Sequence, residues 1–96
     1  MAEIFDWNVQ KNQTLKIRHG VSFEEVVIAF QEKRLLADMR HPSDQYAHQR
    51  LAVVLIEDYT YAVPYIQKGS TRFLKSIYPS RKLHKQYAPN LSGHDR

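Results

Sequence analysis

"RLAVVLIEDYTYAVPYI" (Arg50 to Ile66) decides the fold, because it predicts two neighbouring strands joined by a tight turn. The run from Arg50 to Glu57 is apolar on both faces, which is typical of a central strand. Asp58 predicts the turn, and the chain returns in a second strand from Tyr59 to Ile66. Pro64 has no N–H to donate, so this second strand should bear a bulge or an unpaired stretch there.

The chain before this pair predicts one strand and two helices. Glu3 to Asn8 is typical of a short strand, and Asn8 can cap a helix from Val9 to about His19. Gly20 follows where a left-handed C-cap residue is expected. Ser22 and Glu25 have the spacing of a capping box and predict a second helix with one apolar face.

The remaining elements complete an α+β fold. Arg34 to Arg40 predicts a strand that leads into a polar loop, Thr71 to Tyr78 predicts the last strand, and a helical pattern begins at Ser80. We therefore expect β-α-α, then an antiparallel meander of three to four strands and a short C-terminal helix. Residues 1–87 should form a single domain, and residues 88–96 a flexible C-terminal tail.

Composition excludes several classes of protein. The chain has 96 residues, 43% of them hydrophobic and 25% charged, as in a soluble globular domain. It has no cysteine, which excludes disulfides, thiolate nucleophiles and Cys-based zinc sites. No apolar run approaches the roughly 18 residues of a membrane span, and the N-terminus does not resemble a signal peptide. We expect a cytoplasmic protein with no membrane partner.

Positive charge is concentrated near the C-terminus. The net charge is +4, yet the segment from Lys68 to Tyr87 holds six of the 14 basic residues and no acid, a local balance of +6. The other eight basic residues share the rest of the chain with all ten acids, a balance of −2. A field of this kind favours a polyanion or an acidic protein, although a solvated surface is the simpler alternative.

Cofactor and metal sites are not expected. The three glycines are isolated, so no glycine-rich phosphate loop exists. His41 and His48 flank Asp44 at a spacing that could hold a metal, but nothing fixes a geometry there. A Ser-His-Asp triad lacks its signature turn.

Within the basic segment, strand alternation predicts that Lys75 shares a face with Phe73 and Ile77. Such a lysine either extends its ammonium to water or is a cation held in a partly dry cleft, where its pKa can fall. After Pro79, two cations occupy the first turn of a helix, the end that favours anions: Arg81 and Lys82. A phosphate there would bind the amides and both cations.

Two further expectations concern that helix and its flanks. Arg81, His84 and Lys85 should share one face, opposite Leu83 and Tyr87. Tyr78 and Tyr87 flank the cluster and offer rings on which bases can stack.

The motifs "FDWNVQKN", "HGVSFEE" and "FLKSIYPSRKLHKQY" occur in that order and resemble the BrnT family of bacterial type II toxins over roughly Ile4 to Tyr87. "HPSDQYAHQR" and "YAVPY" are similar to one branch of that family. The residues that match its opening motif are Phe5, Trp7, Lys11, Asn12, His19, Gly20, Ser22, Phe23 and Glu24.

The resemblance implies a RelE-like fold, a ribonuclease that acts on free or ribosome-bound mRNA, and an antitoxin encoded in the same operon. One departure concerns the last strand, where better-known members carry an arginine and this chain carries Ile77. The final helix also differs from the acidic and arginine-rich helix of those members. The family's catalytic residues therefore cannot be transferred directly.

RNA cleavage by such a fold uses the 2'-hydroxyl to attack the adjacent phosphate, with a base, an acid and cations for the extra charge. As base or acid we expect Lys75 or Tyr87, with His84 as an alternative, and as charge-stabilising cations Arg81 and Lys82. The residues expected to bind RNA are Lys11, Arg50, Arg72, Tyr78 and Lys85. A second hypothesis is a catalytically weak or inactive protein of the same fold that binds RNA or the antitoxin.

Overall fold

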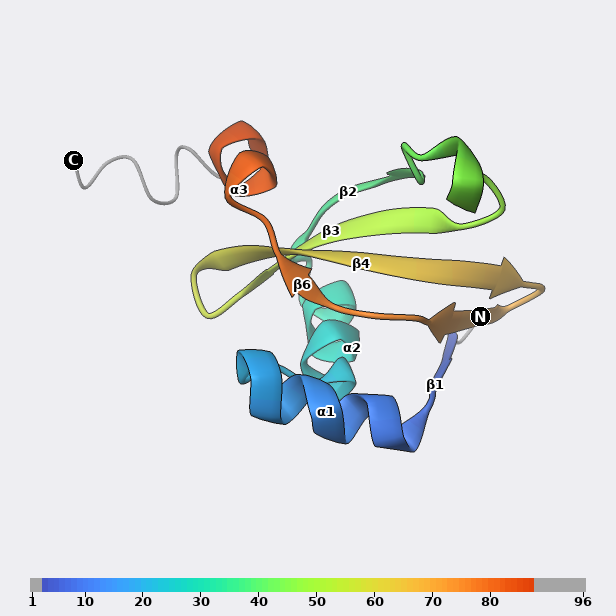
Figure 1. The fold of residues 1–96 in the computed structure, drawn as a ribbon, viewed down its shortest axis with the longest axis horizontal. Coiled ribbons are helices and arrows are strands. Elements are labelled where there is room, and N and C mark those ends of the chain that lie inside the picture. Colours follow the sequence, from blue (N-terminus) through green and yellow to red (C-terminus); the bar gives the residue numbers. More distant parts are fainter. Residues whose placement is uncertain (1–2, 88–96) are drawn as a thin grey trace.

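A six-stranded sheet in the order β1-β5-β4-β3-β2, with β6 also paired to β4, forms the centre of the computed structural model (Figure 1). The structure describes residues 3–87. The elements are β1 (Ile4–Trp7), α1 (Val9–His19), α2 (Phe23–Gln31), β2 (Leu35–Arg40), the 3₁₀ turn η1 (Asp44–Tyr46), β3 (Arg50–Ile56), β4 (Tyr59–Lys68), β5 (Thr71–Leu74), β6 (Tyr78–Pro79) and α3 (Arg81–Tyr87).

The capping residues set the bounds of the first two helices, as the sequence predicts. The Asn8 side chain accepts a hydrogen bond from the Lys11 N–H at 2.9 Å, and Gly20 ends α1 with φ of 70°. The reciprocal capping box between Ser22 and Glu25 begins α2. The expected helix from Val9 to His19 is confirmed in full.

The expected α+β class and antiparallel meander are confirmed, but the sheet is mixed. Strands β2, β3, β4 and β5 pair antiparallel in sequence order. The first strand, β1, pairs parallel with β5 and forms an edge of the sheet. Pattern alone could not show this pairing, because strand alternation does not specify which neighbour a strand takes.

The sheet has two covered faces of different character. Helices α1 and α2 lie against one, which we call the helix face, while α3 and the loop of residues 41–49 stand on the other, which we call the groove face (Figure 1). The core lies on the helix face and includes Leu15, Phe23, Val26, Ala52, Val54, Val63, Tyr65, Leu74 and Ile77. Side chains of β3 that point the other way are also buried, which agrees with the predicted central strand.

The segment after β5 departs from the predicted straight strand. Tyr65 pairs with Leu74 and Ala62 pairs with Tyr78, so one extra residue is inserted opposite β4. The Lys75 N–H donates to the Pro64 carbonyl at 2.8 Å at the start of this bulge. The irregularity expected beside Pro64 is therefore confirmed.

The bulge corrects the predicted surroundings of Lys75. Because of the extra residue, Leu74 and Ile77 both lie in the core, and the side chain of Ile77 is 0% exposed. Lys75 is exposed, with Nζ 5.3 Å from the ring centroid of Phe73. The expectation that Lys75 shares its face with both Phe73 and Ile77 is wrong, since Phe73 alone accompanies it.

Two other expectations bear on the ends of the chain and on membranes. The flexible tail expected for residues 88–96 lies outside the described residues. Between residues 3 and 87, no helix is both long and apolar enough to span a membrane.

Replacing Ile77 tests its place in the core. Ile77→Ala should lower the free energy of unfolding by about 2–5 kcal/mol, because it leaves a cavity at a fully buried position. Ile17→Ala, at a position 86% exposed, is the matched control and should change it by less than about 0.5 kcal/mol. Urea unfolding of the two variants measures this, and equal losses would contradict the assigned burial.

Candidate nucleic-acid interface

Three adjoining hollows run along the groove face of the sheet, and we call them together the groove. The first lies over β1, β4 and β5 and is lined by Asp6, Ile66, Lys68, Thr71, Phe73 and Lys75. The middle one lies between the 41–49 loop and the chain from Lys75 to Tyr78. The third lies under α3. Lys75 lines the first two and Tyr78 the last two, so each hollow adjoins the next.

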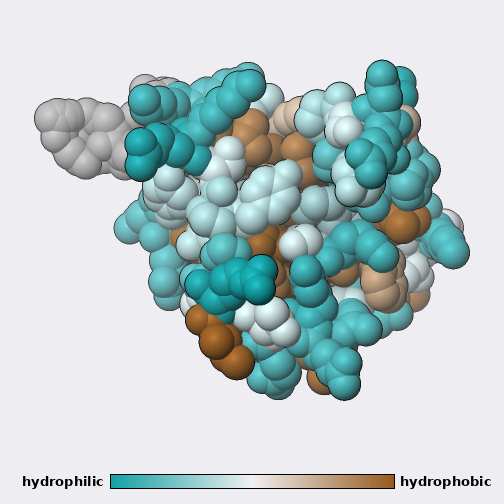
Figure 2. Space-filling model, viewed as in Figure 1, coloured by the Kyte–Doolittle hydropathy of each residue, from teal (hydrophilic) through white to brown (hydrophobic). Residues whose placement is uncertain are grey.

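The groove combines an apolar floor with positive charge. Figure 2 shows hydrophobic residues between the two hydrophilic lobes that α3 and the 41–49 loop form. Leu51, Pro64, Ile66 and Phe73 contribute apolar surface along it. The charged residues that line it are three lysines and a single acid: Lys68, Lys75, Lys82 and Asp6. This composition suits a ligand with flat apolar rings and negative charge.

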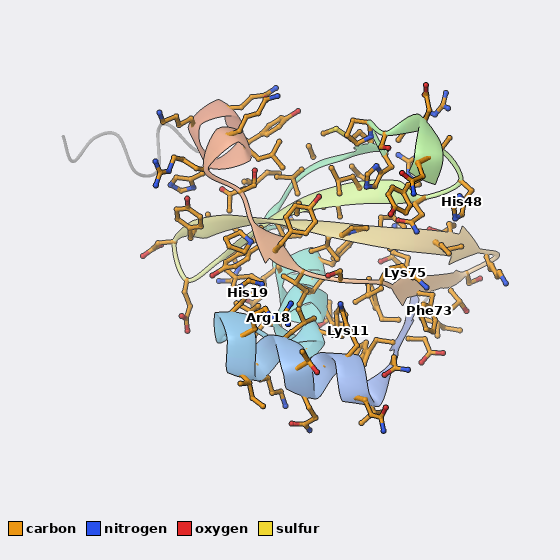
Figure 3. The ribbon with its side chains drawn as sticks, in the orientation of Figure 1. Lys11, Arg18, His19, His48, Phe73 and Lys75 are labelled. Carbon is orange, nitrogen blue, oxygen red and sulfur yellow. The ribbon has the colours of Figure 1, made fainter. Side chains whose placement is uncertain are left out.

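The sheet and the bulge position the central lysine. Strand alternation after Leu74 places Lys75 on the same face as Phe73, near which Figure 3 labels it. Its side chain lines both the first and the middle hollow. Its ammonium makes no ion pair with any acid among residues 3–87. Lys75 is therefore available to bind an anion in the groove.

Two of the predicted stacking residues line the groove. Tyr78 is 40% exposed and lies between the middle and third hollows, and Tyr87 contributes to the third. Partial burial raises the pKa of Tyr78 above its ordinary value of 10.0. At neutral pH its phenol is therefore protonated and can donate a hydrogen bond to an oxyanion.

Helix α3 divides its basic residues between two surfaces. Lys82 lines the third hollow and also an outer basic patch with Arg81, Lys85 and Gln86. The phosphate site expected at the start of the helix is not open, because the Ser80 hydroxyl accepts from the Leu83 N–H at 3.2 Å. With only seven residues, α3 also has a small dipole.

The predicted common face of Arg81, His84 and Lys85 is wrong. His84 Nδ1 lies 2.8 Å from Thr60 Oγ1, and its ring stacks on Tyr59 with centroids 4.4 Å apart. His84 therefore faces the sheet and fixes α3 to β4, whereas Arg81 and Lys85 face outward. None of these three lines the groove.

Two predicted RNA-binding arginines lie on the helix face. Arg72 is 15% exposed, pairs with Glu3 at 2.7 Å, and has its guanidinium carbon 5.0 Å from the ring centroid of Phe30. Arg50 Nε donates to the Asp38 carboxylate at 3.1 Å. Both are held by partners within the fold, and neither lines the groove.

The Asp38 carboxylate that Arg50 binds has a second partner on β4. The Tyr65 hydroxyl donates to the same Asp38 carboxylate at 2.8 Å, so Asp38 joins β2 to β4 as well as to Arg50.

Lys11, the remaining residue predicted to bind RNA, lies on α1, among the helices rather than on the groove face (Figure 3). The structure thus brings together Lys75, Tyr78, Lys82 and Tyr87, and separates Lys11, Arg50 and Arg72 from them.

Sequence reasoning missed the loop side of the groove. His41, Tyr46 and Gln49 line the middle hollow. The His41 ring lies 5.2 Å from that of Tyr46, and its Nδ1 accepts from the Ser43 N–H at 3.2 Å. In the described part of the chain no three potential metal ligands gather around a common point. The polar and aromatic residues of this loop could have indicated a binding surface. The sequence does not show, however, over which face of the sheet the loop folds.

Comparison with known proteins adds no relative, since neither a family model nor a curated protein matches the chain. The resemblance to the BrnT family therefore stays a prediction from the motifs.

Alkaline pH should weaken the fold through three tyrosines whose pKa burial raises: Tyr61, Tyr65 and Tyr78. Below the ordinary pKa of 10.0 both states are protonated and the free energy of unfolding is unaffected. Above it the unfolded chain ionises first, so the free energy of unfolding falls as pH rises.

Urea midpoints measured from about pH 8 to about pH 11 check this loss. Tyr78→Phe should make the alkaline loss smaller than in the wild type, because it removes one of the three phenols. A free energy of unfolding that stays constant over this range would contradict the assigned burial of the phenols.

Proposed function

We propose that the protein is the toxin of a bacterial type II toxin–antitoxin system, with a RelE-like fold, and that it binds and cleaves mRNA in the groove. The observation that supports this most is the groove itself, which has lysines along its length and tyrosines in its middle and third hollows. The motifs shared with the BrnT family support the same activity. The antitoxin encoded in the same operon would hold the protein inactive in the cytoplasm.

Single-stranded RNA fits this chemistry better than a duplex. Binding of single strands combines cations that follow the phosphates with aromatic rings on which bases stack. The groove offers Lys68, Lys75 and Lys82 for the first role and Phe73, Tyr78 and Tyr87 for the second. A duplex keeps its bases stacked on each other and would leave these rings unused.

The reaction would follow from the substrate's own 2'-hydroxyl. Its oxygen attacks the adjacent phosphorus, the bond from phosphorus to the 5'-oxygen breaks, and a 2',3'-cyclic phosphate forms. With Tyr87 as the base, the proton of the 2'-hydroxyl passes to Tyr87 while Lys75 remains a cation, and the protonated phenol of Tyr78 can give a proton to the leaving 5'-oxygen. Lys75 and Lys82 would stabilise the extra negative charge on the phosphorane.

One observation favours a second candidate, an RNA-binding protein that does not cleave. Where better-known members of the resembling family carry an arginine, this chain has Ile77, whose side chain lies in the core and not in the groove. Within residues 3–87 no arginine lines the groove. A bidentate partner for the phosphorane is therefore missing, and lysines alone must supply the charge.

Salt dependence tests the groove as the RNA surface. Three lysines on single-stranded RNA should give a slope of log affinity against log salt of roughly −2. Lys75→Ala with Lys82→Ala should reduce it to about −0.7, because two phosphate contacts are lost. Lys11→Ala, on the helix side, is the matched control and should leave the slope unchanged. Equal slopes for the groove variant and the wild type would place RNA elsewhere.

Expression in bacteria tests the toxin function. The wild type should arrest growth, and co-expression of the neighbouring open reading frame should restore it. Lys75→Ala with Lys82→Ala should relieve the arrest and lower the cleavage rate by about 100-fold or more, because the phosphorane charge is no longer stabilised. Lys11→Ala should remain toxic.

Purified protein separates the two candidates. Cleavage products that end in a 2',3'-cyclic phosphate support the nuclease. If RNA binds in the groove but stays intact, even on ribosomes, the nuclease is excluded and the non-cleaving RNA-binding protein holds.

A further inference from the structure

We propose that the middle hollow of the groove is a pocket for one unpaired nucleobase of the RNA, and that the side-chain amide of Gln49 selects the base. This inference rests on the proposed function and specifies a subsite within the same groove. The motif from His41 to Arg50 was noted only for its resemblance to one branch of the family, and of the predicted RNA-binding residues only Tyr78 lines this hollow.

The pocket has two walls and a floor of suitable shape. The loop contributes His41, Tyr46 and Gln49, and the chain after the bulge contributes Ser76 and Tyr78. The hollow has a volume of about 380 Å³, enough for one base. Ligand sites in proteins begin at about this size, and polar groups placed on their walls fix the orientation of the ligand.

The floor and the two tyrosines supply the stacking surfaces. Pro64, although largely buried, lines the floor of the hollow and contributes apolar surface there. Tyr46 and Tyr78 belong to opposite walls, and both are partly exposed. A base between them would be desolvated on its faces while its polar edge stays free for hydrogen bonds.

The polar groups of the pocket are free to bind a ligand. The Gln49 amide and the hydroxyls of Tyr46 and Tyr78 make no hydrogen bond to any other part of the chain that the structure describes. By contrast, the side-chain amide of Gln67 donates a hydrogen bond to the Gly69 carbonyl at 2.7 Å. A side-chain amide carries a hydrogen-bond donor beside an acceptor, so it can make two hydrogen bonds to the edge of one base.

Two backbone hydrogen bonds fix the position of Gln49 in the loop. The His41 N–H donates to the Gln49 carbonyl at 3.0 Å, and the Gln49 N–H donates to the Tyr46 carbonyl at 2.8 Å. The backbone of Gln49 therefore closes the loop, whereas its side chain has no part in closing it. Replacing the side chain should leave the loop intact, which makes Gln49 a suitable residue to test.

The position of Lys75 favours a nucleotide within an RNA chain over a free base as the ligand. It lines both this hollow and the first one, so its ammonium can bind the phosphate that links the base in the pocket to the next nucleotide. A base in the middle hollow and a phosphate at Lys75 would together fix which bond of the RNA lies beside the proposed acid, Tyr78.

The test measures the binding of short oligoribonucleotides of adenylate, of cytidylate and of uridylate, and of an abasic chain of equal length. The wild type should bind the preferred base about 10-fold more tightly than the abasic chain, since stacking of a base on aromatic residues is of that order. Gln49→Ala should reduce the preference among the three bases by about 5-fold or more and leave abasic affinity unchanged.

Two control variants separate base selection from general effects. Gln45→Ala, an exposed residue of the same loop that does not line the hollow, should keep the wild-type preference. Tyr46→Ala should weaken all three bases alike, because stacking does not depend on the base edge.

The outcomes are distinct. If the wild type binds the abasic chain as tightly as the three oligonucleotides, or if Gln49→Ala keeps the wild-type preference, the pocket is overturned while RNA binding in the groove stands. If the wild type binds no RNA and no abasic chain, the proposed function fails and the pocket with it.

Discussion

The hydrogen bond from the Lys75 N–H to the Pro64 carbonyl, at 2.8 Å, marks the point on which the rest of the structure depends. Pro64 has no N–H to return, so the ladder between β4 and the last strand cannot continue in register there. The chain accommodates this with one extra residue between Leu74 and Tyr78. That residue lets Ile77 enter the core with Leu74 and leaves Lys75 on the groove face.

The two faces of the sheet hold their cations in different ways. On the helix face Arg50 is paired with Asp38, and Arg72 is paired with Glu3 and packed against the ring of Phe30. The planar guanidinium suits such partly buried pairs. On the groove face the lysines make no ion pair within residues 3–87. Arg50 and Arg72 thus stabilise the fold, whereas the lysines of the groove remain available for an anion. Basic residues close in sequence, such as Arg72 and Lys75, therefore have different roles.

Local patterns predicted the helices well because their bounds depend on neighbouring residues. Asn8, Gly20 and the pair Ser22 and Glu25 each act within one helical turn, and the structure has each of them in the expected role. The strand after Thr71 was predicted less well. Its bulge depends on Pro64 in another strand, and a strict alternation along one segment cannot include that partner.

In the candidate site, too, residues within one segment were predicted, whereas contacts between distant segments were not. The basic segment from Lys68 to Tyr87 supplied Lys75, Tyr78, Lys82 and Tyr87, which the groove brings together. His84 was misassigned, because a helical wheel cannot tell that Thr60 and Tyr59 lie beside it. His41, Tyr46 and Gln49 were missed, since they come from a loop far away in the sequence.

By itself the sequence determined the α+β class, the capped helices, the central pair of strands and the concentration of positive charge near the C-terminus. These follow from spacing and composition, which act over a few residues. Only the tertiary structure decided which cations are paired, which way Lys75 and Ile77 point, and which loop faces the basic strand. Those features depend on strand register and on contacts between distant segments, which no local pattern contains.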